Sequence, residues 1–164
     1  MTVGTAPPVT IRAAQYDNHD LRGIEDVRRS VGWLVNTVKE QFRQVARGRR
    51  VLLVADHDRH IVGTITLEWR WTDKQVADGK VIAHISNLVV RPSQQRRGVG
   101  RALVNAAEEI AAVRGCTAVT IGVDEPNVYA RELYERWGYR WLKVTRQPWG
   151  VVHILTRSLP TSQP

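Results

Sequence analysis

The chain has 164 residues, a mass of 18.6 kDa and a formal charge of +8, from 24 Lys and Arg against 16 Asp and Glu. This length predicts one domain, and a single cysteine, Cys116, excludes an intramolecular disulfide framework and a cysteine-rich zinc site. Because the apolar runs are far shorter than the roughly 20 residues of a membrane span, and the first residues lack a secretory-signal pattern, we expect a cytoplasmic protein.

The two ends of the chain differ from its middle. Residues 1–8 contain Gly4, Pro7 and Pro8 without periodicity, and residues 160–164 are similar, so both are expected to form short tails. No linker, repeat or low-complexity tract separates the remainder. Residues 9–159 are therefore predicted to form a single domain.

Secondary-structure signals in the first half indicate a strand, two helices and three further strands. Alternation predicts a strand over 9–13, and the polar residues 17–20 offer a helix start. Apolar residues at helical spacing predict an amphipathic helix over about 31–46. Apolar runs bounded by polar turns then predict strands over 51–55, 61–69 and 81–90.

The second half alternates helices and strands. An apolar stripe predicts a helix over about 98–114, a strand follows over 117–123, and a short helix after Pro126 ends at Gly138. The last two strands are predicted over 139–144 and 151–156. The resulting order, β-α-α-β-β-β-α-β-α-β-β, implies a mixed sheet with helices packed on it.

The most informative segment runs from Leu88 to Leu103, where a buried strand enters a loop of Gln and Arg and a helix begins at once. The first turn of that helix would present unpaired N–H groups and its positive dipole end, which together bind anions. Gly98 and Gly100 lack side chains, so a phosphate group could approach the backbone closely. The expected ligand is a phosphate or pyrophosphate, and a purely structural turn is the alternative.

Two sequence blocks resemble those of the GCN5-related N-acetyltransferase (GNAT) superfamily. Gln95–Gly100 is similar to its acetyl-coenzyme A signature of Gln or Arg, two residues, Gly, one residue, then Gly or Ala, and Leu88–Pro92 resembles the preceding strand end. Asn127–Tyr139 resembles a second block, with Asn, Ala, Leu-Tyr-Glu and Gly-aromatic at matching spacings. The resemblance is specific over 84–139, and the element order extends it to 9–159.

The resemblance implies an α/β (α+β) fold, with a mixed, mostly antiparallel central sheet of about seven strands flanked by about four helices. It implies acetyl-coenzyme A as the acyl-donor cosubstrate and no metal. The pyrophosphate would rest on the amides of Arg96 to Arg101, and the pantetheine arm would pair with the backbone of Leu88 and Val90. The implied coenzyme-binding residues are Leu88, Val89, Val90, Gln95, Arg96, Arg97, Gly98, Val99, Gly100, Arg101, Asn127 and Tyr134.

The implied reaction is transfer of an acetyl group to a primary amine by direct attack in a ternary complex. Tyr134 matches the family's general acid, although it also lies on the apolar stripe of its helix and could be a core residue. For the general base, His84, Glu68 and a water remain open, and either side chain could instead be structural.

The expected partner is a small-molecule or peptide amine. Two alternatives stay open: a non-catalytic acyl-coenzyme A sensor, and an acetyltransferase acting on aminoacyl-tRNA or on a protein lysine or N-terminus. A nucleic-acid partner is not favoured, because the best basic cluster is already assigned to coenzyme phosphates, and no membrane is expected. A homodimer is left open. Cys116 is expected to be a buried apolar residue, and most of the six tryptophans are expected to lie in the core.

Overall fold

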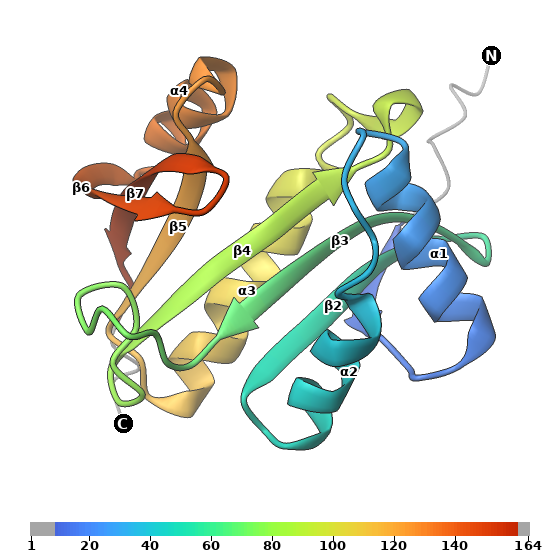
Figure 1. Cartoon of the computed structure of the whole chain (residues 1–164), viewed down its shortest axis with the longest axis horizontal. Coiled ribbons are helices and arrows are strands. Elements are labelled where there is room, and N and C mark those ends of the chain that lie inside the picture. Colours follow the sequence, from blue (N-terminus) through green and yellow to red (C-terminus); the bar gives the residue numbers. More distant parts are fainter. Residues whose placement is uncertain (1–8, 161–164) are drawn as a thin grey trace, which may run out of the picture. The chain divides into compact units, whose positions relative to one another are not determined.

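The computed structural model describes residues 9–160 (Figure 1). The predicted tails lie outside the described residues, apart from residue 160, the first residue of the C-terminal tail. The described part contains seven strands, four α-helices and a short 3₁₀ helix. In chain order they are β1 (Thr10–Ala13), α1 (Asn18–Arg29), α2 (Val38–Ala46), β2 (Arg50–His57), β3 (His60–Glu68), β4 (Ile82–Val90), the 3₁₀ helix η1 (Pro92–Gln94), α3 (Val99–Arg114), β5 (Ala118–Asp124), α4 (Val128–Arg136), β6 (Arg140–Gln147) and β7 (Gly150–Ser158).

The strands form one sheet in the order β1-β2-β3-β4-β5-β7-β6. Strands β4 and β5 are parallel, with Ile82–Ile85 opposite Ala118–Ile121, whereas β1 with β2, β5 with β7 and β6 with β7 are antiparallel. The predicted mixed, mostly antiparallel sheet is therefore confirmed. Within residues 9–160, no helix is both long enough and apolar enough to cross a membrane.

The chain divides into two compact units. The first contains the described residues up to Thr66 together with Asn87–Ala106, and the second contains Leu67–Ser86 together with the described residues from Ala107 onward. Strands β3 and β4 and helix α3 each contribute residues to both units.

In the first unit, α1 and α2 pack on β2 and β3 (Figure 1). Their shared core consists of buried aliphatic side chains and one phenylalanine: Ile24, Val27, Val38, Phe42, Leu52, Val54, Ile61 and Val89. Gly23 allows the close approach of α1 to β3, because a Cβ atom built on it would lie 2.5 Å from Cγ1 of Ile61. Any larger residue at position 23 would therefore push the helix away from the sheet.

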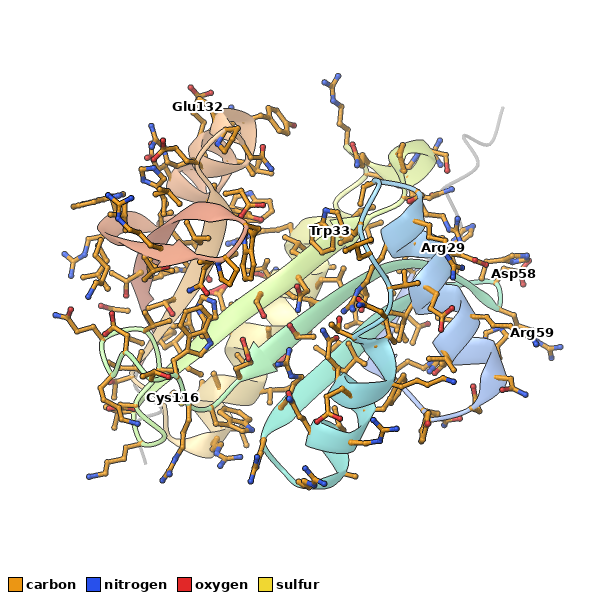
Figure 2. All side chains as sticks on the ribbon, viewed as in Figure 1. Arg29, Trp33, Asp58, Arg59, Cys116 and Glu132 are labelled. Carbon is orange, nitrogen blue, oxygen red and sulfur yellow. The ribbon has the colours of Figure 1, made fainter. Side chains whose placement is uncertain are left out.

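The predicted helix over 31–46 is wrong in its first part, since α2 begins only at Val38. Helix α1 ends at Arg29 and is followed by a turn in which Gly32 has a φ of 82° and the amide of Trp33 donates to the carbonyl of Arg28. Leu34, which supported the longer helix, is 82% exposed. The helical spacing of apolar residues therefore extended into a turn whose side chains are mostly exposed. Trp33 lies in this connection between α1 and α2 (Figure 2).

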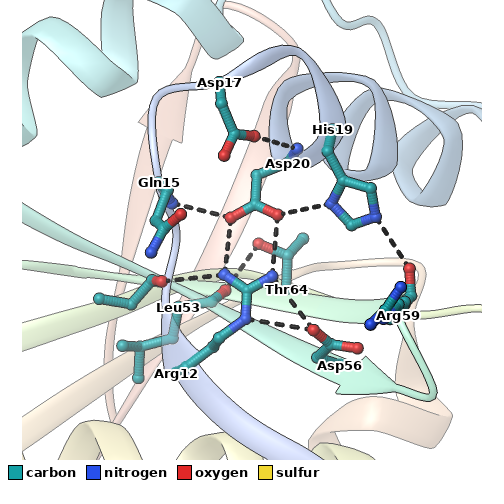
Figure 3. A network of polar contacts seen from close by, with 10 residues as sticks. Arg12, Gln15, Asp17, His19, Asp20, Leu53, Asp56, Arg59 and Thr64 are labelled. Carbon is teal, nitrogen blue, oxygen red and sulfur yellow. Dashed lines mark hydrogen bonds and ion pairs between the residues drawn. The ribbon is translucent and has the colours of Figure 1, made fainter.

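A buried carboxylate joins β1, β2 and α1 in the first unit (Figure 3). Asp20 is 1% exposed and accepts hydrogen bonds from Nη1 and Nη2 of Arg12 at 2.7 and 2.9 Å, and from the amide of Gln15 at 2.8 Å. Nδ1 of His19 lies 3.0 Å from its other oxygen, and Arg12 also reaches Asp56 on β2. This network fixes the start of α1 against the sheet edge.

In the second unit, β7 lies between β5 and β6, and its buried side chains pack against the β3–β4 connection. The core here combines Val76, Val152 and Ile154, with Trp71 and Leu142 packed against it. The expectation that most tryptophans lie in the core is wrong, because only Trp69 falls in the buried class. The guanidinium of Arg114 covers the ring of Trp69 at 3.9 Å.

Candidate coenzyme and catalytic site

The loop between β4 and α3 has a backbone that depends on its glycine. Arg96 and Gly98 have φ values of 62° and 83°, and α3 begins directly afterwards at Val99. The amide of Ala102 donates to the carbonyl of Gly98 at 3.0 Å, so the amides of Val99 and Gly100 precede the first helical hydrogen bond. With no acidic residue in the first turn, this helix start favours an anion.

Three arginines border this loop. Arg96 and Arg97 are exposed and Arg101 is half-buried. Guanidinium groups form paired, charge-assisted hydrogen bonds with phosphate oxygens. The donor set of amides and guanidiniums therefore fits a pyrophosphate, although the φ of Gly98 alone would also require a glycine in a purely structural turn.

The strand that leads into the loop is irregular at Asn87. This residue has a φ of 53° inside β4, and its side-chain nitrogen donates to Oγ1 of Thr66 at 3.1 Å. Beyond it, Val89 is buried, and Leu88 and Val90 are half-buried. The apolar pattern of this strand did not predict the irregularity; the usable signal was the residue type, because asparagine tolerates the left-handed region.

The side chain of Gln95 also has a structural contact. Its side-chain amide donates to the carbonyl of Val90 at 3.0 Å, which ties the loop back to the end of β4. The structure thus brings Leu88, Val89, Val90 and the loop from Gln95 to Arg101 together in the first unit. The other predicted site residues, Glu68, His84, Asn127 and Tyr134, belong to the second unit.

Glu68, at the end of β3, is held by two donors. Its Oε2 accepts from Nε1 of Trp71 at 3.0 Å and from Oγ of Ser86 at 3.1 Å. The side chain of Glu68 is half-buried, so its carboxylate retains partial access to solvent. Ser86 lies on β4, and Trp71, whose ring also packs against His84, contacts both candidate bases.

His84 is 1% exposed and its ring is fixed on two sides. Nδ1 lies 2.8 Å from Oγ1 of Thr120, whose hydroxyl donates to the carbonyl of Val76 at 2.7 Å. Since that hydroxyl proton is already used, Thr120 accepts and Nδ1 of His84 donates. The ring also packs edge-on against Trp71, with centroids 4.4 Å apart. His84 thus links β4, β5 and the β3–β4 connection as a core residue.

Tyr134 is 7% exposed and lies in an aromatic group on α4. Its ring centroid is 5.6 Å from that of Trp137 and 6.4 Å from that of Tyr139. Burial raises the pKa of its phenol above the usual value, so the hydroxyl is protonated at neutral pH. Among residues 9–160, this hydroxyl has no hydrogen-bond partner, so its proton is available to a ligand.

Asn127 has a local structural function. Its Oδ1 accepts from the amide of Ala130 at 3.1 Å, which caps the N-terminus of α4. Its exposed side chain retains the amide nitrogen for any further contact.

A concave surface of about 740 Å³ lies in the second unit, between the β3–β4 connection and the β6–β7 hairpin. Trp71 and Trp149 contribute aromatic faces to it, and Nζ of Lys143 lies 2.6 Å from Oδ2 of Asp73 inside it. Its full lining is Arg70, Trp71, Thr72, Asp73, Lys143, Val144, Thr145, Gln147 and Trp149. The contribution of the β6–β7 hairpin was not predicted from the sequence, where the usable signal was a tryptophan, Trp149, beside a glycine turn.

Parallel strand β4 of the mixed sheet runs through a glycine-containing loop into a helix start without acidic residues, an arrangement found in the class of proteins that offer an anion site at a helix N-terminus. The chain belongs to the acetyltransferase (GNAT) family, whose sequence profile matches residues 18–139. It is 30% identical over 121 residues to the glucosamine 6-phosphate N-acetyltransferase of Trypanosoma brucei brucei, covering 74% of this chain and 69% of that protein. The predicted family membership is confirmed.

Two further comparisons bear on length and fold. The chain is 36% identical over 63 residues to the chloroplastic GCN5-related N-acetyltransferase 4 of Arabidopsis thaliana, a match over 38% of this chain and only 22% of that protein. A crystal structure of aminoglycoside 6'-N-acetyltransferase complexed with coenzyme A has a similar fold, with a TM-score of 0.75 and 16% identity, over 94% of this chain and 99% of the other.

Proposed function

We propose that the chain is an N-acetyltransferase that moves the acetyl group of acetyl-coenzyme A to a primary amine of a small molecule. The observation that carries the proposal is the helix start at Val99, where unused amides and no acidic side chain follow the left-handed Gly98. This is a phosphate-binding arrangement at the position where the family signature falls.

The coenzyme would be held mainly by the first unit. The pyrophosphate would rest on the loop amides, with Arg96, Arg97 and Arg101 as charge partners. The pantetheine arm would use backbone groups of Leu88 and Val90. The carbonyl of Val90 already accepts from Gln95, but a carbonyl oxygen has a second lone pair and can accept again.

The proposed reaction is a direct attack. The amine nitrogen forms a bond to the thioester carbon, the carbon–sulfur bond breaks, and the departing sulfur takes the proton of Tyr134. The nitrogen gives up one proton as the amide forms, and that proton restores the phenol of Tyr134. One property supports Tyr134 as this acid: its hydroxyl has no partner among the described residues, so its proton can be donated to the sulfur. The protonated acceptor must also lose a proton before it attacks.

For that proton we favour Glu68 over His84. Nδ1 of His84 already donates to Thr120, and the ring is 1% exposed, so a substrate amine would have to enter the core to reach it. Glu68 is half-buried and bonds to Trp71, which lines the concave surface of the second unit. A carboxylate behind one wall of an acceptor pocket can take a proton directly or through a water.

The concave surface itself is proposed as part of the acceptor site. Trp71 and Trp149 offer apolar faces of the kind that pack against sugar rings, and Asp73 and Lys143 offer a carboxylate and an ammonium for polar groups. The Trypanosoma relative described above is named for glucosamine 6-phosphate, and the structural neighbour is named for aminoglycosides. Amino sugars are therefore the first acceptors to test.

The test has a binding arm and a turnover arm. Titration calorimetry should show coenzyme A binding to the wild-type protein, and a double Arg96→Gln/Arg97→Gln variant should bind about tenfold more weakly. Arg47→Gln/Arg49→Gln is the matched control, because both arginines are exposed and lie in the first unit. Absence of coenzyme binding would overturn the proposal.

The turnover arm separates an enzyme from a sensor. Release of free coenzyme A thiol should depend on added amine across a panel that starts with amino sugars. Coenzyme binding without thiol release for small amines, peptides or aminoacyl-tRNA would favour the acyl-coenzyme A sensor. Cytoplasmic location remains part of the proposal. The open question of a homodimer would be tested by sedimentation.

A further inference from the structure

A second depression, of about 580 Å³, lies in the first unit and has no part in the proposed acetyl transfer. Residues from the start of α1, the β2–β3 turn, the start of β3 and the end of β4 border it. Its lining is Asn18, His19, Arg22, Gly23, Asp26, His57, Arg59, His60, Ile61, Val62, Arg91 and Gln94. Three arginines and three histidines thus face one space that contains a single carboxylate.

The arginines of this basic depression are not neutralised. Among residues 9–160, none of Arg22, Arg59 and Arg91 forms an ion pair. Nε of Arg91 donates to the carbonyl of Ile61 at 3.0 Å, which anchors the side chain and leaves its two terminal nitrogens for another acceptor. The one acid, Asp26, is exposed and lies 3.6 Å from Arg29 on its own helix.

The turn that carries Arg59 is held in place. Asp58 and Arg59 have φ values of 50° and 67°, and Figure 2 shows both on this turn. Nε2 of His19 lies 2.8 Å from the carbonyl of Arg59, and Nδ1 of the same ring bonds to the buried Asp20 (Figure 3). A binding site gains affinity when its donors are fixed before the ligand arrives.

One lining residue also has an unmet hydrogen-bonding group. Nδ1 of His57 is buried and has no partner among the described residues. Buried polar groups are almost always satisfied, so this nitrogen beside the depression calls for a partner such as an ordered water.

We propose that the basic depression is a second anion site, for an organic phosphate that carries at least two negative charges. Phosphoryl oxygens point in three directions and suit cations that converge from separate segments, whereas a planar carboxylate suits a single guanidinium fork. The volume exceeds that of an inorganic anion, and Ile61 and Val62 supply an apolar floor for an organic part.

The experiment must separate this site from the coenzyme loop, because Gln94 lines the depression and Gln95 opens the loop. Titration calorimetry with inorganic pyrophosphate, and with fructose 1,6-bisphosphate as an organic probe, is therefore run at about 150 mM salt with saturating acetyl-coenzyme A present. We expect one further site, with tighter binding of the organic probe. This binding measurement does not depend on catalysis. The anion-site proposal can therefore fail while the proposed acetyltransferase function holds, and the acetyltransferase proposal can fail while the anion site is found.

The variant is Arg22→Gln/Arg59→Gln, which removes two charges but keeps side-chain length, and glutamine carries the same backbone strain as arginine at position 59. Binding should weaken about tenfold or more. The control is again Arg47→Gln/Arg49→Gln, which has the same change in net charge outside the depression. Equal losses in both variants, equally strong binding of citrate, or complete competition by acetyl-coenzyme A would each overturn the proposal.

Discussion

The buried Asp20–Arg12 pair offers a direct test of what holds the first unit together. Asp20→Asn keeps the shape of the side chain but removes its charge, and it turns one acceptor into an N–H donor that faces the donors of Arg12. Four hydrogen bonds end on the two oxygens of Asp20, from Arg12, Gln15 and His19. The substitution would therefore disrupt contacts to three segments of the unit.

The expected cost can be worked from burial. Breaking a buried ion pair by removing one partner costs about 3–5 kcal/mol. The side chain of Arg12 is 29% exposed and keeps a second acid in Asp56, so the cost should lie at the lower end, at about 3 kcal/mol. Urea unfolding followed by circular dichroism measures this difference. Asp26→Asn, on the same helix and 58% exposed, should change stability by about 0.5 kcal/mol or less.

The loss should also depend on pH. The pKa of the Asp20 carboxyl lies well below its usual range, and the largest cause is the hydrogen bond from Arg12. Because the unfolded carboxyl titrates near about 3.9, the unfolded state binds more protons below that pH, and the wild-type advantage shrinks as the pH falls from 4 toward the folded pKa. A difference below about 1 kcal/mol at pH 7, or one unchanged between pH 7 and pH 3, would refute this account.

Three further changes have defined outcomes. Tyr134→Phe should lower the acetyl-transfer rate by about 100-fold or more without weakening coenzyme A binding; equal losses in both would mean that the ring is only structural. Gly98→Ala should raise the KM for acetyl-coenzyme A about tenfold through strain at its φ of 83°, whereas Gly32→Ala, at a φ of 82° outside the loop, should leave that KM unchanged. Arg28 is 2% exposed and has no acidic partner in residues 9–160. Its burial and, to a smaller extent, the nearby charge of Arg50 lower its pKa to about 10. Arg28→Met should raise the free energy of unfolding at pH 7 by about 1 kcal/mol, and a loss above 1 kcal/mol would show that its bond to Gln41 outweighs the buried charge.

The parts of the fold that were predictable from sequence are those set by neighbouring residues. The order of strands and helices follows from local periodicity, and the helix start after Gly98 follows from a glycine that a left-handed φ requires. The beginning of α2 was not predictable in this way. Leu34 keeps the helical spacing, but the turn at Gly32 redirects the chain, and nothing in the spacing of apolar residues records that change.

The parts that were missed depend on contacts between distant residues. Lys143 meets Asp73 across 70 positions, and Trp149 lines the same concave surface from the β6–β7 hairpin. The basic depression is likewise assembled from α1, the β2–β3 turn and the end of β4, so its charges are scattered in the sequence. Only a strand register and a helix position can bring such residues together, and a single sequence specifies neither directly.

Hydrogen-bond partners and burial distinguish candidate catalytic residues that the sequence alone could not rank. A general acid or base needs an atom that is free to exchange a proton with substrate. His84 already donates from Nδ1 to Thr120, so only Nε2 could accept a proton, and the ring is 1% exposed. The hydroxyl of Tyr134 carries no such obligation within residues 9–160. The ring of Tyr134 can therefore pack in the core while its hydroxyl remains available to donate a proton. The structural and the catalytic interpretations of Tyr134 do not exclude one another.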